Sequence, residues 1–338
     1  MTLAPRSLYR TLLLLTFSCV LALAQPYLYV ANQNSNSISA VNTRDNTVAP
    51  PLAASFSPAG LALSPDGTRL YATNPNGNLV VVYNTANNAV VTSLAIGQLP
   101  QGIAADSTRI YVTLQGNAAL AVYSAVNFQL QTILRVGFGP AAVALSPINS
   151  QVYVVNTYSS TLSIIDSARI GTSANPVLGS VVVPDSPIAI AVSRDGLTAW
   201  VLSSAIPTLT RMNLTTGAIE NRIALPLSPG GLALSDDSTR AYIPGYGPKL
   251  ATVDLQRNVV LHSTDLPPCA TPRCLAMAAA VSADGKLVYV ANTSLNQIAI
   301  VNADSGELSP TRIVVQQSPR AIVLGPAPQP APSSEVTN

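Results

Sequence analysis

The chain has 338 residues, of which 48% are hydrophobic and only 9% are charged, and its formal net charge is +2. The apolar fraction is that of a folded protein, which excludes a disordered chain. With one histidine, His262, and three glutamates, the composition also disfavours metal sites built from several histidines and most acid/base enzymes.

The N-terminal segment has the pattern of a secretory signal peptide. Arg6 and Arg10 precede an apolar run over residues 12–23, and the Ala-Leu-Ala string at 22–24 fits a cleavage site. We therefore expect residues 1–24 to be removed on export, although an uncleaved anchor or a buried helix also has such an apolar run. Cleavage removes two of the 17 basic residues and none of the 15 acidic ones. The mature chain is then neutral, and its predicted location is secreted or periplasmic.

Beyond the signal, an aromatic residue recurs in a short apolar strand at intervals of 40 to 47 residues. The seven copies are Tyr29, Tyr71, Tyr111, Tyr153, Trp200, Tyr242 and Tyr289. An apolar run and a turn such as Ser-Pro-Asp-Gly at 64–67 precede the aromatic strand, and strands such as Leu79–Tyr83 and Val90–Ile96 follow it. A proline, which can begin a strand without a backbone N–H, opens most units. These prolines are Pro58, Pro100, Pro140, Pro187, Pro229 and Pro319.

Four short strands per unit, repeated in this way, predict an all-β, seven-bladed β-propeller over residues 25–325. The first unit begins at its second strand, Tyr27 to Asn32, and the last stops after its first, Arg320 to Leu324. We therefore expect the N- and C-terminal strands to share one blade and to close the ring, which removes an open edge. Residues 326–338 contain four prolines and predict a disordered or extended tail.

These units resemble the YVTN-type β-propeller repeat, as in the string Leu-Ala-Leu-Ser-Pro-Asp-Gly-Thr-Arg-Leu-Tyr-Ala-Thr-Asn at 61–74. The resemblance covers roughly residues 27–325 and is specific for the fold. Proteins with this repeat include extracytoplasmic binding proteins and surface-layer proteins. Similar propellers form parts of lactonases and of quinoprotein, nitrite reductase and nitrous oxide reductase enzymes, so the resemblance leaves the function open.

The residue types that usually carry chemistry have structural explanations here. The repeated aromatics suit a stacking platform, but their common position favours packing between neighbouring blades. Aspartates such as Asp66 and Asp195 are expected to form turns, because no loop has the ligand spacing of a calcium site. His262 falls near the end of a predicted outer strand, without a nucleophile motif. We therefore expect no catalytic residue, no metal and no cofactor.

Cys269 and Cys274 lie five residues apart in an insertion before the last full unit. In an exported chain, two such cysteines are typical of a disulfide that closes a loop. A zinc site would need further ligands, and the spacing is not that of a redox Cys-x-x-Cys motif.

The candidate binding site lies where the inner strands begin, because propeller ligands usually bind at that end of the axis. The start positions after the prolines are Ala59, Gln101, Ala141, Ile188, Gly230 and Arg320, while Arg273 follows Pro272 within the insertion. Loops at the same end add amides and a lysine. The candidate ligand-binding residues are Arg320, Arg273, Gln101, Lys249, Asn32, Asn74, Asn156 and Asn292. They predict an amide-rich mouth without a carboxylate cluster, suited to a small anion, a sugar or a peptide, although a solvated loop surface has a similar composition.

The function favoured at this point is a non-catalytic binding or interaction scaffold at the cell envelope, with a protein or a small polar ligand as its partner. The alternatives are a lactonase-like hydrolase, the propeller subunit of a redox enzyme, and a protein that binds single-stranded DNA. Scattered basic residues and a neutral mature chain disfavour nucleic acid. After signal cleavage, the sequence predicts no membrane span.

Overall fold

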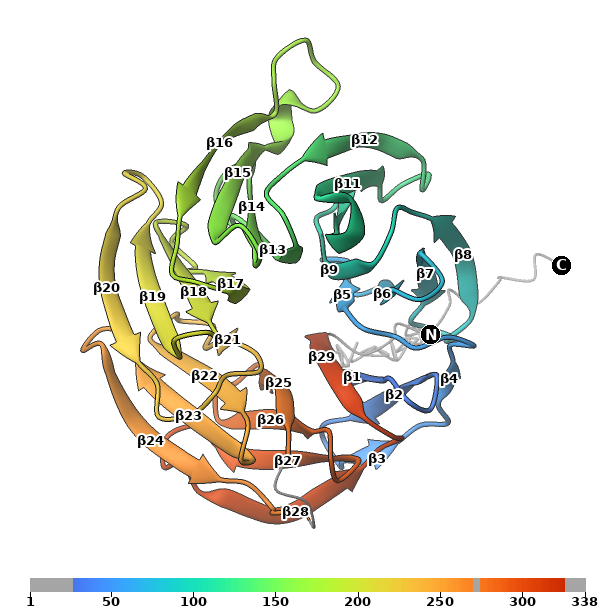
Figure 1. The fold of residues 1–338 in the computed structure, drawn as a ribbon. Helices are drawn as coiled ribbons and strands as arrows, with labels where there is room; N and C mark the ends of the chain where they lie inside the picture. Colours follow the sequence, from blue (N-terminus) through green and yellow to red (C-terminus); the bar gives the residue numbers. More distant parts are fainter. Residues whose placement is uncertain (1–26, 270–273, 326–338) are drawn as a thin grey trace, which may run out of the picture.

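The computed structural model describes residues 27–269 and 274–325, which form seven antiparallel β-sheets arranged in a ring (Figure 1). This arrangement confirms the predicted all-β, seven-bladed propeller. The predicted signal peptide and the Pro-rich tail lie outside the described residues. No helix in the described part of the chain is long and apolar enough to cross a membrane.

Blades 1 to 3 each contain four consecutive strands, with the first strand innermost. Blade 1 contains β5 (Leu61–Leu63), β6 (Arg69–Asn74), β7 (Leu79–Asn84) and β8 (Val90–Ala95). Blade 2 contains β9 (Pro100–Ala105), β10 (Arg109–Leu114), β11 (Ala119–Ser124) and β12 (Leu130–Arg135), with the 3₁₀ turn η1 (Gln115–Asn117). Blade 3 contains β13 (Pro140–Leu145), β14 (Gln151–Asn156), β15 (Thr161–Asp166) and β16 (Val177–Val182), with η2 (Ser167–Arg169).

Blades 4 to 6 follow the same order. Blade 4 contains β17 (Pro187–Val192), β18 (Thr198–Ser203), β19 (Thr208–Asn213) and β20 (Ile219–Ala224). Blade 5 contains β21 (Ala233–Leu234), β22 (Arg240–Gly245), β23 (Lys249–Asp254) and β24 (Val259–Asp265). Blade 6 contains β25 (Ala276–Val281), β26 (Leu287–Asn292), β27 (Gln297–Asn302) and β28 (Leu308–Val314).

Blade 7 combines the two ends of the described chain, where β29 lies beside β1 (Figure 1). It contains β29 (Pro319–Gly325), β1 (Tyr27–Asn32), β2 (Ser37–Asn42), β3 (Thr47–Val48) and β4 (Leu52–Ala53). Strand β29 pairs with β1 in an antiparallel register that places Tyr27 opposite Gly325. Both short strands β3 and β4 pair with β2 and together take the outer position. The predicted closure of the ring is therefore confirmed.

The core lies between blades, where each aromatic of the repeat packs on the next sheet. Six tyrosines of the repeat are at most 1% exposed and Trp200 is 3% exposed. Tyr71 of blade 1, for example, packs with Ile110 and Val112 of blade 2. Burying a large apolar side chain contributes about 1.5–3 kcal/mol to the stability of the fold. Each of these contacts needs two neighbouring blades. The aromatics are therefore core residues and not a stacking platform.

Hydroxyl groups on the second strands, or directly after them, hold the starts of the inner strands of the neighbouring blades. Thr73 Oγ1 donates to the carbonyl of Gln101 at 3.0 Å, and Thr157 Oγ1 donates to the carbonyl of Pro187 at 2.7 Å. Thr293 makes the same contact across to blade 7, at 2.6 Å from the carbonyl of Pro319. These bonds hold the start of one inner strand against the blade before it, so the end of the axis has a defined shape.

Candidate functional site

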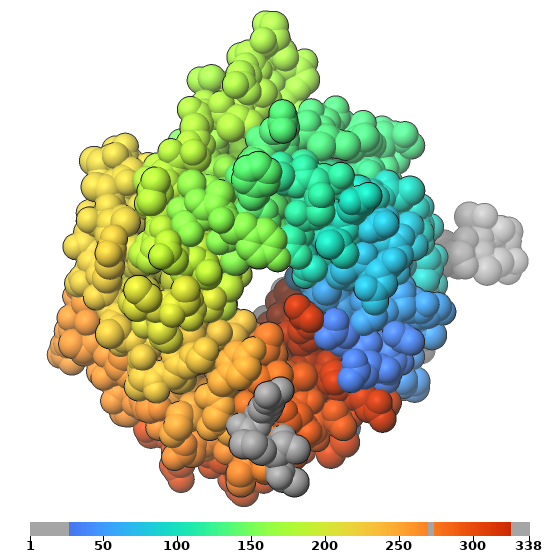
Figure 2. All heavy atoms as spheres, viewed as in Figure 1, coloured from blue at the N-terminus to red at the C-terminus, as the bar shows by residue number. Residues whose placement is uncertain are grey.

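A pocket of about 640 Å³ lies at the end of the axis where the inner strands begin. Figure 2 shows the opening on the axis of the ring. All seven blades contribute to the wall, and the volume is within the range of small-molecule sites. The lining residues are Ala59, Gln101, Gln115, Ala141, Thr157, Tyr158, Ile188, Ser204, Ser228, Pro229, Gly230, Tyr246, Met277 and Arg320.

Each blade supplies one inner-strand start position to this wall, and six of the seven are those expected from the prolines. The seventh is Met277, which sequence reasoning missed, while Arg273 lies outside the described residues. In blade 6, Ala276 pairs with Asn292 as Pro140 pairs with Asn156 in blade 3, so Ala276 takes the place of the proline. Ala276 also stands six residues before the turn Ser282. Blades 1 to 5 have the same spacing between the proline and the turn, so this spacing could have identified Met277 from the sequence.

The four predicted asparagines do not line the pocket. Asn32, Asn74, Asn156 and Asn292 are buried at the ends of their strands, and their amides bond to nearby loops. The Nδ2 groups of Asn32 and Asn156 each donate to a serine hydroxyl of the next strand at 2.9 Å. Asn74 Oδ1 accepts from the backbone N–H of Gly77 at 2.9 Å. Asn32, Asn74 and Asn156 bond within their own blades, and none of the four asparagines is among the described residues that line the pocket.

Lys249 does not line the pocket either. It begins β23, and its ammonium forms an ion pair with Asp265 of the neighbouring strand β24. Among the described residues that line the pocket, Arg320 is the one charged side chain. Its Nη1 donates to Gln33 Oε1 at 3.2 Å. Of the three predicted cations, the described wall therefore includes Arg320, while Lys249 is paired elsewhere and Arg273 lies outside the described residues.

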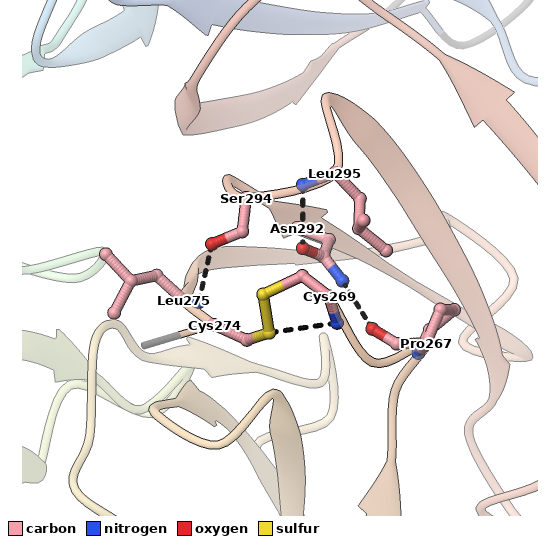
Figure 3. The surroundings of a disulfide bond; sticks show 7 residues. All are labelled: Pro267, Cys269, Cys274, Leu275, Asn292, Ser294 and Leu295. Atoms are coloured by element: carbon pink, nitrogen blue, oxygen red, sulfur yellow. Dashed lines mark hydrogen bonds between the residues drawn. A yellow bond between two sulfur atoms is a disulfide. The ribbon is translucent and has the colours of Figure 1, made fainter. Parts of the chain in front are cut away.

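Cys269 and Cys274 form a disulfide with a Cα–Cα distance of 5.8 Å in the connection between β24 and β25 (Figure 3). The connection is fastened to the end of β26, because Asn292 Nδ2 donates to the carbonyl of Pro267 at 3.2 Å. Leu275 N–H also donates to Ser294 Oγ at 3.1 Å. The cross-linked segment leads directly into β25, and so it positions Met277 at the pocket.

Below the pocket the channel continues between the inner strands as a smaller space of about 300 Å³. Met277 and Arg320 line both spaces. The strands approach closely here, since a Cβ on Gly102 would lie 2.6 Å from the carbonyl oxygen of Ala141. Glycine at that position allows adjacent blades to meet at the axis.

The other candidate groups lie away from the axis. His262 is on the outer strand β24, with Nε2 at 3.2 Å from the carbonyl oxygen of Asp304 in blade 6. Within residues 27–269 and 274–325, no three His, Cys, Asp or Glu side chains come together in a way that could hold a metal ion. The aspartates of the Ser-x-Asp turns accept hydrogen bonds from their own turns, as in the 2.5 Å contact between Ser64 Oγ and Asp66 Oδ1.

Comparisons with solved structures identify the same architecture at low sequence identity. A protein of unknown function from Desulfotomaculum acetoxidans has a TM-score of 0.75 at 13% identity, over 89% of this chain and 99% of that one. Hydrazine synthase of Kuenenia stuttgartiensis has a TM-score of 0.71 at 15% identity, over 78% and 88%. The dihydro-heme d1 dehydrogenase NirN has a TM-score of 0.63 at 16% identity, over 88% and 74%.

Neither a known sequence family nor a curated protein matches the chain. The structural similarities, all at 16% identity or less, show that the chain shares the propeller fold of these proteins. Because one fold hosts unrelated activities, the fold alone does not assign a function to this chain.

Proposed function

We propose that this chain is an exported binding protein of the cell envelope, of the YVTN propeller type, that holds a small polar ligand in the axial pocket without transforming it. The observation that carries the proposal is the composition of the pocket wall. Among the lining residues that the structure describes, amides, hydroxyls, aromatic and aliphatic groups surround one guanidinium, that of Arg320. Such a wall can orient a ligand through hydrogen bonds and apolar contact.

The alternatives need groups that the described lining residues do not provide. A lactonase-like hydrolase needs a general base and a second polarising group within reach of the substrate. No carboxylate or imidazole is among the described residues that line the pocket. Binding of single-stranded DNA needs several cations along a groove with exposed aromatics, whereas the described residues of this pocket include one cation. Non-catalytic binding is therefore the proposal that these residues support best.

The proposal is tested by filling the pocket. Ala141→Trp and Gln101→Trp each place an indole at an inner-strand start position, whereas Ala86→Trp places one on an exposed hairpin outside the pocket wall. Each protein is incubated with a low-molecular-weight extract of the native cell envelope and examined by native mass spectrometry. We expect a bound mass with the wild type and with the Ala86 variant, and its loss with both pocket variants. Retention of that mass by folded pocket variants would contradict the proposal.

A further inference from the structure

The order of the blades around the axis gives the pocket two unlike sides. Arg320 comes from blade 7 and Gln101 from blade 2, with Ala59 of blade 1 between them. Gln115, which also lines the pocket, follows β10 of blade 2. Blades 7, 1 and 2 therefore form a polar side with one guanidinium and two carboxamides.

Blades 3 to 6 form the opposite side, where the larger side chains are apolar or aromatic. Ile188 of blade 4 and Met277 of blade 6 occupy the inner-strand start positions, and Tyr158 and Tyr246 project from loops of blades 3 and 5. The hydroxyls on this side are partly committed to the backbone. Thr157 Oγ1 donates to the carbonyl of Pro187 at 2.7 Å, and Ser204 Oγ donates to that of Ser186 at 3.2 Å.

The two tyrosines of this side differ from those of the repeat because they are accessible. Tyr158 is 74% exposed and Tyr246 is 48% exposed. The ring of Tyr158 lies over Gly139, where an added Cβ would meet its Cδ2 at 2.5 Å. The backbone N–H of Tyr158 also donates to the carbonyl of Phe138 at 3.1 Å. The ring therefore lies against the backbone at Gly139 and presents an accessible aromatic surface at the pocket.

The charge on the polar side sets the charge of the ligand. A guanidinium has five N–H donors, and the hydrogen bond recorded for Arg320 within the described chain uses one of them, on Gln33. No carboxylate of the described residues lines the pocket to neutralise this cation. One anionic group on the ligand would form charge-assisted hydrogen bonds there. For a second anionic group, the described residues of the wall provide no cation to offset its desolvation.

We infer that the axial pocket takes an organic monoanion with an aromatic body. The acidic group pairs with Arg320 beside Gln101 and Gln115, and the aromatic body lies against Tyr158 and Tyr246. This inference rests on the proposed binding function and adds the chemical class of the ligand.

Two dyes with the same aromatic body test the inference. 8-Anilino-1-naphthalenesulfonate carries one negative charge, and N-phenyl-1-naphthylamine is its uncharged counterpart. We expect fluorescence titration to give a saturable site at which the anion binds roughly tenfold more tightly than the neutral dye, since only the anion forms a charge-assisted hydrogen bond with Arg320. Ala141→Trp should abolish this site.

Charge and stacking are then separated by variants. Arg320→Gln should raise the Kd of the anionic dye roughly tenfold and leave that of the neutral dye within about twofold. Tyr246→Ala should raise both Kd values. Arg257→Gln is the matched control, because that arginine is 78% exposed in the β23–β24 hairpin and outside the pocket wall. It should change neither Kd.

Three results would overturn the inference: no saturable binding of the anionic dye, equal Kd values for the two dyes, or no effect of Arg320→Gln. These results are distinct from failure of the proposed function. If a pocket-filling variant loses an uncharged ligand of the native envelope, the binding function stands and the inference about charge falls. If the dyes behave as expected but the native ligand survives both pocket-filling variants, the proposed function falls.

Discussion

At four turns of the repeat, a serine hydroxyl donates to the aspartate two residues later. These pairs are Ser64–Asp66, Ser193–Asp195, Ser235–Asp237 and Ser282–Asp284, with Oγ–Oδ1 distances of 2.5 to 2.6 Å. The serine hydrogen bond lowers the pKa of each carboxyl, and backbone N–H donors in the same turn add to this effect. Because folding lowers these pKa values, the four carboxyls make the stability of the fold depend on pH.

The first prediction concerns stability in acid. Because folding lowers the pKa of these four carboxyls, their stabilising effect is fully present above the unfolded value of about 4 and is lost as the pH falls through the folded values. We expect the free energy of unfolding, measured with urea from pH 7 to pH 2.5, to decline below about pH 4. Replacing all four aspartates by asparagine should flatten this decline. An unchanged slope in that variant would contradict the assignment.

At the scale of one element, the connection from β24 to β25 is distinct because it lacks the proline that opens other inner strands. The disulfide between Cys269 and Cys274 and the hydrogen bonds of Asn292 and Leu275 hold this connection instead. A covalent link thus precedes Ala276, the position at which other blades have the proline. Reduction should loosen the start of β25 and leave the other blades unchanged.

The second prediction follows from the short loop that this bridge closes. Replacing both cysteines by alanine should lower the free energy of unfolding by about 2 kcal/mol, which is the chain-entropy value for a loop of this size. Urea unfolding of the oxidised wild type and the double variant measures the difference. Dithiothreitol should destabilise the wild type to the same extent and leave the variant unaffected. Equal stabilities in the absence of reductant would show that the bridge does not stabilise the ring.

At the scale of the whole molecule, closure depends on one strand from the end of the described chain. Strand β29 is the innermost strand of blade 7 and pairs with β1 along its length. It also carries Arg320, so the same strand closes the ring and supplies the cation of the pocket. Stability and ligand binding are therefore coupled through β29.

The third prediction is that a chain ending at Gln317 loses the closed ring. Without β29, the edge of β1 is unpaired and the apolar contacts of Ile322 and Leu324 with blades 6 and 7 are lost. We expect the Tm to fall by more than about 10 °C, since 1 kcal/mol corresponds to a few degrees in a domain of this size. Scanning calorimetry provides the measurement, with a chain ending at Gly325 as the control. A truncated protein with the Tm of the control would contradict this role for β29.

The fold was predictable from the sequence because blades bury the same positions in every repeat. The aromatic residues, the turns and the prolines therefore recur in register, and six of the seven inner-strand start positions follow from them. Met277 was not found because Ala276 replaces the proline and Pro272 precedes it in the insertion. The sequence position of Lys249 suggested a place at the mouth of the pocket. In the structure, Lys249 instead forms an ion pair with Asp265 of the neighbouring strand.

The four predicted asparagines lie away from the pocket wall for a different physical reason. An asparagine at the end of a strand is typical of a solvated loop, so the sequence suggests that it is exposed. Whether it is buried depends on its hydrogen-bond partners across the hairpin. Asn32 and Asn156 each have a serine seven residues later, at Ser39 and Ser163, whose hydroxyl accepts from the amide. That spacing is visible in the sequence once the hairpin register is known. The division of the pocket into polar and aromatic sides depends on the order of blades around the axis, which no local pattern contains.

The pairing of β29 with β1 also sets a sequence of events in time. Tyr27 and Gly325, which face each other in blade 7, are almost 300 residues apart along the chain. During synthesis from the N-terminus, β1 and β2 emerge early, but their inner partner emerges after six complete blades. Such long-range pairing is slow and leaves a strand edge exposed to aggregation while it waits. A nascent chain of this design would depend on a holding factor, or on delayed folding, until its last strand is released.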